Sequence, residues 1–250
     1  FPSSTILGIL PSVTNNLDPN ISFANNSKEF YSRIEAAAVN FDMKLKENPT
    51  KNVYLITSST QEAGKSTFGY EFSNFFADVY DKKVCILDLD YKRGDLHRKF
   101  NSEKMPSTTN FNNINFEEHK ISKNLTFIPR IAGQSENFIR LVNDTSSFKN
   151  TLTKLRNDFD VVFIDSTPML GSSDALAIIQ YIDAIFFVVK EGTTPMRDLQ
   201  NSINILKDIS NIEPYIIYNF YKSKSSLYSY KYSYKYDYKY SYLSDEDEQT

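Results

Sequence analysis

The sequence predicts an α/β fold in which helices cover both faces of a mostly parallel β-sheet. Short, continuously apolar runs alternate with longer stretches whose apolar residues recur at three- and four-residue steps. A phosphate-binding loop joins one apolar run to a helix, and acidic residues close two further runs. Because strands that are apolar throughout are buried on both sides, helices must cover both faces of the sheet.

The predicted elements form one domain that ends near Phe220. Apolar runs predict strands at 6–11, from 53 onward, and at 84–87, 125–129, 161–165, 184–189 and 215–218. Apolar periodicity predicts helices at 29–41, 66–81, 137–159, 174–181 and 196–209. The phenylalanines of helix 66–81 are interpreted as core packing, and the Asn-rich stretch 101–123 has only weak structural preferences.

The loop after the strand at residue 53 has the residues needed to hold a nucleotide triphosphate. Gly64-Lys65-Ser66-Thr67 opens a helix, where backbone N–H groups and the helix dipole attract anions. In such loops the lysine contacts the terminal phosphates and the hydroxyl binds Mg²⁺. We therefore expect a P-loop NTPase-like fold, with Ala63 and these four residues contacting the nucleotide. Ser59 stands where the usual loop pattern has glycine.

Three carboxylates, Asp88, Asp90 and Asp165, lie at the predicted carboxyl ends of core strands. Ligands of open α/β sheets bind outside these ends, so all three are expected near the phosphate loop. Mg²⁺ prefers one or two carboxylates together with water and phosphate oxygens. An aspartate after a strand can also cap a helix or stabilise a turn, and this alternative stays open for each one. Their coincidence with Gly64-Lys65-Ser66 favours a Mg²⁺–nucleotide site.

The composition limits the other function classes. With 250 residues and 40% hydrophobic content the chain can form one sizeable core, and a net charge of −3 gives no support for nucleic-acid binding. Cys85 lies in an apolar run, and His97 and His119 have no ligand spacing, so these residues give no argument for a disulfide framework or a metal site. No apolar run approaches the roughly 18 residues that span a membrane. The first residue is Phe rather than Met, so we expect a piece of a longer chain.

The C-terminal segment has a different composition from the rest. Tyrosine occupies every second position from Tyr228 to Tyr242, and the acidic run 245–248 follows. This period would place all rings on one face of a strand, but the repeat is of low complexity and has no β-branched aliphatic residue, so we expect disorder. An aggregation-prone or interaction repeat is the alternative interpretation.

Several motifs together resemble the cytoplasmic kinase domain of bacterial tyrosine kinases (BY-kinases) of capsule and exopolysaccharide assembly. The stretch from Asp88 to His97, Asp-Leu-Asp-Tyr-Lys-Arg-Gly-Asp-Leu-His, is similar to their acidic Walker A′ motif, Asp-x-Asp-x-Arg. Strand 161–165 with the following Ser-Thr-Pro resembles their Walker B strand, and Asp174 follows at the familiar distance. Segment 6–11 is similar to the one after the membrane span in fused members. The tyrosine-rich tail also agrees, so the resemblance covers essentially the whole chain.

The resemblance implies a protein-tyrosine autokinase that uses ATP and Mg²⁺ and acts in trans within an oligomer. It implies catalytic roles for Lys65, Asp88 and Asp90, metal binding by Ser66, Asp88 and Asp165, and adenine contact by Asn219. The implied phosphorylation sites are Tyr228, Tyr230, Tyr232, Tyr234, Tyr236, Tyr238, Tyr240 and Tyr242.

The resemblance also implies a setting for the domain. The activity would regulate capsular or exopolysaccharide synthesis and export at the cytoplasmic face of the bacterial inner membrane. Its partners would be further copies of the chain, a membrane co-polymerase domain and a cognate tyrosine phosphatase, and no nucleic acid. The expected organisation is a linker at 1–28 after an upstream membrane segment, the kinase domain at 29–221, and the tyrosine tail at 222–250.

The chain departs from the family pattern at three places. Gln61-Glu62-Ala63 replaces Pro-Gly-Glu, which removes a glycine able to adopt positive φ and adds a negative charge near the phosphates. Lys92 stands where arginine is usual, so a planar bidentate donor is lost. The ring-assembly pattern Glu-x-x-Arg-x-x-Arg is not matched, since Glu29 is followed by Ser32 and Glu35. Ring formation is therefore the implied property with least support in the sequence.

Two other functions are compatible with the same loop. ParA/MinD-type ATPases share the strands, loop and acidic motifs, but carry a signature lysine five residues before the loop lysine, where this chain has Thr60. They also lack a tyrosine repeat. A degenerate nucleotide-binding regulator of a membrane polysaccharide assembly is the non-enzymatic alternative, and it rests on the changed residues 61–63. A eukaryotic-type kinase is excluded because the chain has no His-Arg-Asp or Asp-Phe-Gly motif.

Overall fold

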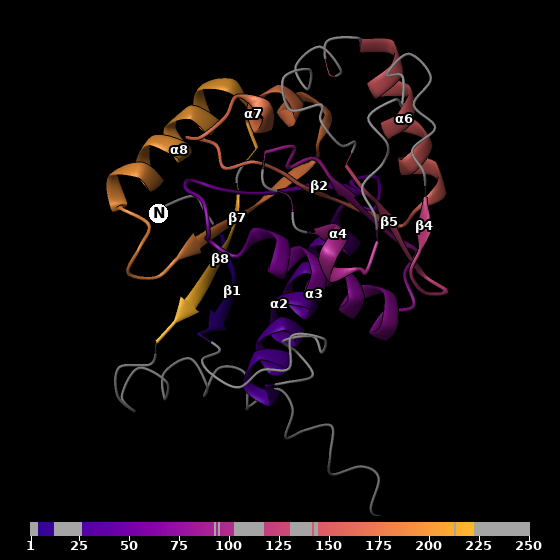
Figure 1. The fold of residues 1–250 in the computed structure, drawn as a ribbon, viewed down its shortest axis with the longest axis horizontal. Helices are drawn as coiled ribbons and strands as arrows, with labels where there is room; N and C mark the ends of the chain where they lie inside the picture. Colours follow the sequence, from indigo (N-terminus) through magenta and orange to yellow (C-terminus); the bar gives the residue numbers. More distant parts are fainter. Residues whose placement is uncertain are drawn as a thin grey trace, which may run out of the picture.

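An eight-stranded β-sheet forms the centre of the molecule (Figure 1). The structure, a computed structural model, describes residues 5–12, 27–92, 94, 96–102, 118–130, 142, 145–212 and 214–222. The strands are β1 (Thr5–Pro11), β2 (Val53–Ser58), β3 (Val84–Asp88), β4 (His119–Lys120), β5 (Leu125–Ile128), β6 (Val161–Asp165), β7 (Ala184–Lys190) and β8 (Tyr215–Tyr221). The helices are α2 (Lys28–Glu47), α3 (Lys65–Val79), α4 (Leu96–Lys99), α6 (Thr145–Asp158), α7 (Asp174–Ile178), the 3₁₀ helix η2 (Ile179–Tyr181) and α8 (Met196–Ile209).

The strands run in the order β1-β8-β7-β2-β6-β3-β5-β4. Every pairing is parallel except that of β4 with β5. The central strands β2, β3 and β6 are buried at every position, as their continuous apolar sequences predict. The predicted mostly parallel α/β fold is confirmed.

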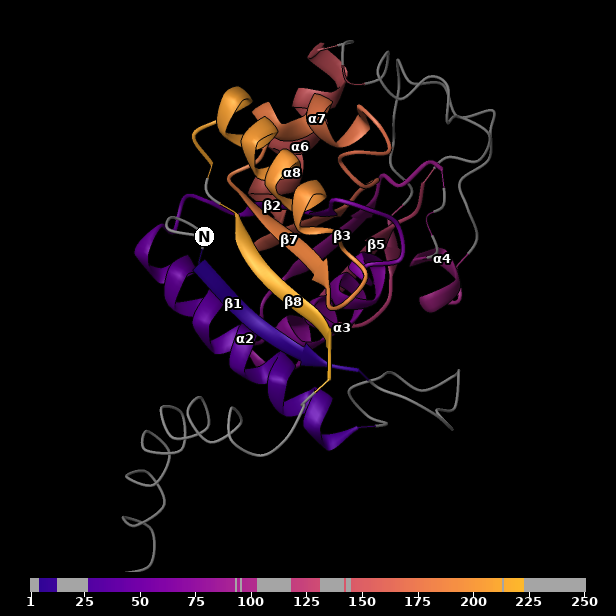
Figure 2. The ribbon, with the colours of Figure 1, turned by 90° about the vertical axis from the view of Figure 1, so that its left-hand side faces the viewer.

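Helices cover both faces of this sheet, and Figure 2 shows the layers edge-on. On one face α6, α7 and α8 bury Leu152, Ile178 and Leu206 against the strands. On the other face α2 and α3 form a core that is rich in aromatic rings. Phe41 of α2 meets the rings of Tyr54 and Phe186 edge-on, each with a centroid separation of 4.8 Å.

The aromatic stripe of α3 belongs to this second core. Phe68, Phe72, Phe75 and Phe76 are each at most 6% exposed, which confirms their interpretation as core packing. Ring pairs of this kind stabilise a core by about 0.5–1.5 kcal/mol beyond the burial of apolar area. The α2–α3 side thus provides a rigid support for the loop that precedes α3.

The structure differs from the sequence predictions in several elements. The two-residue strand β4 lies within a stretch predicted to have weak structure, and it pairs with the next strand, β5, as a local antiparallel hairpin. Helix α2 continues to Glu47, beyond the predicted end at residue 41, and the predicted helix 174–181 finishes as a 3₁₀ turn. Of the predicted helix 137–159, the structure describes Val142 and α6, while 137–141, 143 and 144 lie outside the described residues.

The sheet extends into the segment predicted as a linker. β1 lies within residues 1–28 and pairs in parallel with β8, where Ser12 N–H donates to Tyr221 O at 3.0 Å. Leu7 and Leu10 of β1 are buried in the α2–α3 core, so apolar burial holds this strand to the sheet. Among the described residues, the folded domain therefore begins at Thr5. Of the predicted tail, only Lys222 is described.

No described helix combines the length and the apolar character that crossing a membrane would require.

Candidate nucleotide-binding site

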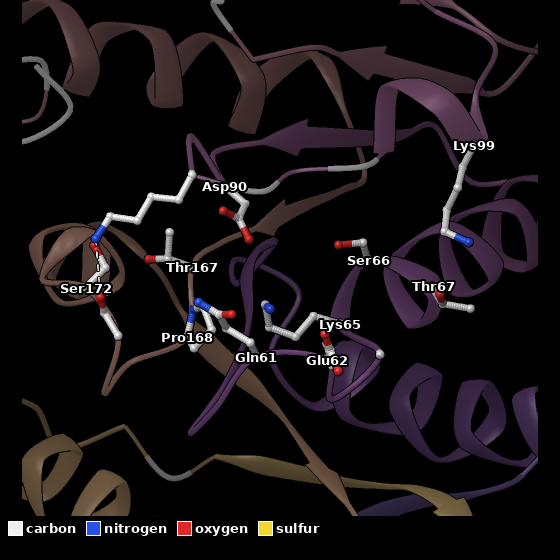
Figure 3. Close-up of a pocket in the computed structure, with 13 residues that line it drawn as sticks. Gln61, Glu62, Lys65, Ser66, Thr67, Asp90, Lys99, Thr167, Pro168 and Ser172 are labelled. Atoms are coloured by element: carbon white, nitrogen blue, oxygen red, sulfur yellow. Dashed lines mark hydrogen bonds between the residues drawn. The ribbon is translucent and has the colours of Figure 1, made fainter. Parts of the chain in front are cut away.

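A pocket of about 260 Å³ opens at the carboxyl edge of the sheet, beside the loop that joins β2 to α3 (Figure 3). Its lining comes from the loop and first turn of α3, the turn after β3, the loop after β6, and α4. The lining residues are Gln61, Glu62, Gly64, Lys65, Ser66, Thr67, Asp90, Lys92, Lys99, Thr167, Pro168, Gly171 and Ser172. Parallel α/β sheets bind their ligands at this edge.

The loop delivers the start of a 15-residue helix to the pocket. Gly64 is the helix N-cap with φ of +90°, a conformation that L side chains rarely adopt, and Phe68 N–H donates to its carbonyl at 2.9 Å. Lys65 follows at 6% exposure, and Ser66 and Thr67 line the pocket beside it. A helix start with unpaired N–H groups next to a lysine provides a favourable site for phosphate.

Glu62 adopts the backbone conformation that glycine would favour at this position. Its φ is +59°, in the left-handed region, and it stands where the BY-kinase pattern has glycine. Left-handed backbone at a non-glycine residue costs about 1 kcal/mol or more. The side chain is exposed and lines the pocket, so its carboxylate lies on the wall that faces the expected phosphates.

Ser59, the second departure in the loop, is part of a buried polar contact. It is 1% exposed, and its Oγ lies 3.1 Å from Oγ of Ser202 on α8. Its carbonyl accepts from Leu170 N–H at 3.3 Å. The serine side chain thus adds a contact between the base of the loop and α8, while the backbone of the same residue binds the loop after β6.

The two acidic strand ends meet side by side. Asp88 of β3 and Asp165 of β6 are register partners, and both are fully buried. Asp88 Oδ1 accepts from Asp90 N–H at 3.1 Å, and Asp165 Oδ2 accepts from Ser66 Oγ–H at 2.6 Å. The other oxygen of each carboxylate, Asp88 Oδ2 and Asp165 Oδ1, is buried and has no hydrogen-bond partner among the described residues.

Both carboxyl groups have pKa values above the ordinary range for aspartate. Burial, followed by the negative charge of Asp165, raises the pKa of Asp88, although the Arg130 guanidinium opposes this shift. Burial raises the pKa of Asp165 to about 6, although the Lys65 ammonium and the Ser66 hydroxyl favour its ionised form. Two adjacent buried carboxylates without a cation resist simultaneous ionisation.

A divalent cation fits this arrangement of oxygens. An unsatisfied buried oxygen costs free energy, and the two orphaned carboxylate oxygens lie at neighbouring strand ends beside the Ser66 hydroxyl. Within the described part of the chain no three His, Cys, Asp or Glu residues form a group able to hold a metal by themselves. Mg²⁺ in nucleotide sites takes one or two carboxylates and completes its shell with water and phosphate oxygens, which suits this partial set.

The turn after β3 is packed tightly around Asp88. A Cβ on Gly94 would lie 2.5 Å and 2.7 Å from the two carboxylate oxygens of Asp88, so a larger residue does not fit. Gly94 N–H and Arg130 Nη1 both bind the carbonyl of Asp90, at 2.8 Å and 2.7 Å. Lys92, at the position where the family has arginine, reaches across the pocket mouth and donates to Gly171 O at 3.2 Å.

The predicted site residues occupy two positions relative to the pocket. Lys65, Ser66, Thr67, Gly64 and Asp90 line it, while Asp88 and Asp165 lie buried at the strand ends behind Asp90 and Ser66. Ala63 is buried in the loop, and Asn219 does not line the pocket; its side chain binds the loop backbone from β8. The predicted phosphorylation sites, Tyr228 to Tyr242, lie outside the described residues.

The structure adds residues that the sequence analysis did not single out. Thr167, Ser172 and Lys99 line the pocket, and Arg130 holds the turn that carries Asp90. Arg130 is 9% exposed and lies two residues after the end of the short strand β5. A basic residue after a core strand, at the edge where two aspartates also end, is the sequence feature that could have identified it.

Comparisons with known proteins identify the family of the chain. The family model described as AAA domain matches residues 55–214. Tyrosine-protein kinase ptk of Acinetobacter johnsonii is 28% identical over 171 residues, which are 67% of this chain and 23% of that protein. Tyrosine-protein kinase etk of Escherichia coli K12 is 26% identical over 224 residues, which are 84% of this chain and 30% of that protein. The chain therefore spans less than a third of the length of these two relatives.

Solved structures show the same fold. The kinase domain of Escherichia coli tyrosine kinase ETK matches with a TM-score of 0.76 at 18% identity, covering 89% of this chain and 92% of that one. The ATP complex of a McdA variant from Cyanothece matches with a TM-score of 0.55 at 19% identity, covering 68% and 70% of the two chains. The chain therefore belongs to the AAA-domain family, and its predicted resemblance to the cytoplasmic kinase domain of the bacterial tyrosine kinases is confirmed.

Proposed function

We propose that this domain is a protein-tyrosine kinase that transfers the γ-phosphoryl group of Mg-ATP to tyrosines of its own C-terminal tail. The observation that carries the proposal is the convergence of Lys65, Ser66 and three aspartates at one pocket edge, with two carboxylate oxygens lacking partners among the described residues. Phosphoryl transfer needs little beyond positioning and charge stabilisation, which this set of residues can supply.

Each residue has a role that follows from its charge and position. Lys65 neutralises the terminal phosphates at the start of α3, and Ser66, Asp88 and Asp165 hold the metal ion. When bound, Mg²⁺ supplies the positive charge that offsets the negative charge of the transferred phosphoryl group. Asp90, in the pocket wall, orients the incoming phenol and accepts its proton. A free tyrosine has a pKa of about 10, so a nearby carboxylate is needed to activate it at neutral pH.

The tail is the proposed substrate. From Lys222 to Thr250 five lysines balance five acidic residues, so the unmodified segment is neutral. Each phosphate adds about −1.5 to −2 charges at pH 7, and several would make the segment strongly anionic. A flexible segment reaches a neighbouring copy because its span grows with the square root of its length. We therefore infer transfer in trans within a homo-oligomer, and release of subunits as charge accumulates.

The cellular setting of the proposal follows from the family. The proposed location is the cytoplasmic face of the bacterial inner membrane, beside a membrane co-polymerase domain, with a cognate tyrosine phosphatase to reverse the modification. The proposed process is capsular or exopolysaccharide synthesis and export. A relative of similar length supports the kinase activity: tyrosine-protein kinase CpsD of Streptococcus pneumoniae is 24% identical over 208 residues, 80% of this chain and 90% of that protein.

The partition-type ATPase remains the second candidate, because McdA shares the fold. Thr60 in place of the signature lysine argues against it. The curated relatives named tyrosine-protein kinases, at 28% and 26% identity, support the kinase. A degenerate regulator is the third candidate, motivated by the strained Glu62 in the loop.

Incubation with Mg-ATP, followed by mass spectrometric mapping of phosphotyrosine, tests the proposal. We expect phosphate on tyrosines between Tyr228 and Tyr242 in the wild type and none in Lys65→Met. Lys207→Met, which changes an exposed lysine of α8 remote from the pocket lining, is the matched control and should behave as the wild type. ATP hydrolysis without phosphotyrosine would favour the ATPase, and binding without turnover would favour the regulator.

The trans step needs a mixing experiment. A mass-tagged Lys65→Met chain is incubated with wild-type chain and Mg-ATP. We expect phosphotyrosine on the tagged, inactive chain, at a rate that rises with the concentration of wild type. Phosphate confined to the untagged chain would show transfer within one molecule and contradict the trans proposal.

A further inference from the structure

The side-chain amide of Asn219, on β8, binds the backbone of the phosphate loop. Asn219 Nδ2 donates to the carbonyl of Ala63 at 2.9 Å, across 156 residues of sequence. Asn219 Oδ1 accepts from Phe220 N–H at 2.9 Å, so both ends of the amide are engaged and its orientation is defined. The side chain is 6% exposed and is held on β8, next to β7 in the sheet.

The side chains of Asn219 and Phe220 also pack directly against Gly64. A Cβ built on Gly64 would overlap Asn219 Nδ2 and would lie 3.3 Å from Cε2 of Phe220. Phe220 itself has φ of +60°, and its ring lies under the Lys190 ammonium at 4.7 Å from the centroid. The end of β8 thus packs directly against the residue whose left-handed backbone begins α3.

This placement matters because the loop has lost the glycine that is usual at residue 62. Glu62 occupies left-handed backbone at a cost, so the loop conformation must be imposed by its surroundings. The acceptor of this hydrogen bond, the carbonyl of Ala63, belongs to the residue between Glu62 and the N-cap Gly64. The hydrogen bond is therefore positioned to hold the strained segment in the shape that presents the Lys65 N–H and its neighbours to phosphate.

We propose that Asn219 is a positioning residue of the phosphate loop, and that it acts through the Ala63 carbonyl rather than by contact with the adenine base. The inference rests on nucleotide binding within the proposed function, and it makes a prediction that an adenine-contacting residue would not make. Loss of the amide should weaken every ligand that the loop holds by its phosphates, whatever base it carries.

The test measures the affinity of three probes by calorimetry: Mg-ATP, Mg-GTP and magnesium tripolyphosphate, which has no base. The variants are Asn219→Ala and Asn219→Asp, the second of which keeps the volume but replaces the donor with an acceptor. Asn74→Ala is the control, because Asn74 Nδ2 also donates to a backbone carbonyl, that of Tyr70 at 2.8 Å, within α3 and outside the pocket lining. We expect both Asn219 variants to weaken all three probes by a similar factor of about tenfold, and the control to leave them unchanged.

A second measurement does not depend on any ligand. Hydrogen exchange of the amides in residues 59–66 of the nucleotide-free protein should accelerate in Asn219→Ala and not in Asn74→Ala. Together with the uniform loss of affinity, this would establish that Asn219 orders the loop.

Three results would overturn the proposal. Weakening of ATP alone, with tripolyphosphate unchanged, would assign Asn219 to the base. Reduced binding stoichiometry at unchanged affinity would assign it to stability only, and unchanged affinity and exchange would assign it no role in the loop. If the wild type binds none of the probes, the proposed function fails as well. If binding behaves as expected but no phosphotyrosine forms, only the kinase proposal fails.

Discussion

The charged groups at the two ends of the sheet differ in burial and in hydrogen bonding: the part-buried pair at the amino end is satisfied, and the fully buried carboxylates at the carboxyl end are not. At the amino end, Asp183 Oδ2 accepts from the N–H groups of Asn52 and Val53 at 3.0 Å and 2.9 Å and forms an ion pair with Arg156. Arg156 Nη2 also donates to Tyr181 O at 2.8 Å. At the carboxyl end, Asp88 and Asp165 face each other with like charge, and each has a buried oxygen that lacks a partner among the described residues.

We interpret the paired groups at the amino end as stabilising the fold, and the unpaired carboxylates at the carboxyl end as groups retained to bind a ligand. A satisfied network at the amino end contributes to folding stability, whereas unsatisfied carboxylates at the carboxyl end lower it in the absence of a cation. Active sites commonly retain such destabilising groups because their chemistry requires them. Four experiments test this difference between the two ends.

The largest expected effect is on activity at the carboxyl end. Asp88→Asn removes one carboxylate charge, so we expect tail phosphorylation to fall by about 100- to 1,000-fold. In the metal-free protein the same change removes the repulsion with Asp165, so the free energy of unfolding should rise. Chemical denaturation with EDTA and a phosphotyrosine assay with Mg-ATP measure the two effects. A variant that loses both stability and activity would contradict the division between the two ends.

The second effect is a pH dependence of stability. The pKa of Asp165 is raised to about 6 in the folded protein, against 3.8 for an ordinary aspartate, so the folded state binds the proton more tightly than the unfolded state. The free energy of unfolding of the metal-free protein should therefore fall as pH rises from about 4 to about 6, by as much as about 3 kcal/mol. Asp165→Asn should flatten this part of the profile. An unchanged slope in the variant would assign the pH dependence to other groups.

The third effect is a loss of stability at the amino end. Asp183→Ala leaves Arg156 without its ion-pair partner and two backbone N–H groups without an acceptor, so unfolding should become easier by about 2 kcal/mol. Nucleotide affinity and tail phosphorylation, measured well below the melting temperature, should match the wild type. Reduced phosphorylation per folded molecule would show that the two ends are coupled.

The smallest expected effect concerns the strained residue of the loop. Glu62→Gly removes both the left-handed strain and the charge, and should stabilise the protein by about 1 kcal/mol while raising Mg-ATP affinity several-fold. Glu62→Gln removes only the charge, so it should recover part of the gain in affinity and none of the gain in stability. Equal behaviour of the two variants would show that backbone strain at residue 62 has no measurable effect.

Much of the fold could be predicted because local patterns agree with the final contacts. The runs 84–87 and 161–164 are apolar throughout, and the structure places β3 and β6 in the fully buried centre of the sheet. The meeting of Asp88 and Asp165 follows from the same logic, since parallel strands end at a common edge. Their roles in binding Mg-ATP stay predictions.

The missed features depend on contacts between distant residues. The hydroxyl of Ser59 contacts that of Ser202 on α8, and the side chain of Asn219 on β8 binds the phosphate loop. The sequence separations of these contacts belong to no periodic pattern. The two-residue strand β4 is too short for a pattern of its own. At Glu62, tertiary packing imposes a backbone conformation that the residue disfavours, so the local sequence does not indicate it.

The direction of β8 decides where the chain leaves the sheet. Because β8 runs parallel to β7, Tyr221 and Lys222 emerge at the carboxyl edge, the edge at which the pocket opens. A reversed last strand of seven residues would have released the chain at the opposite rim, about 20 Å away at ~3.3 Å per residue. The polarity of this strand thus places Lys222, the first residue of the proposed acceptor segment, at the same edge of the sheet as the proposed nucleotide pocket.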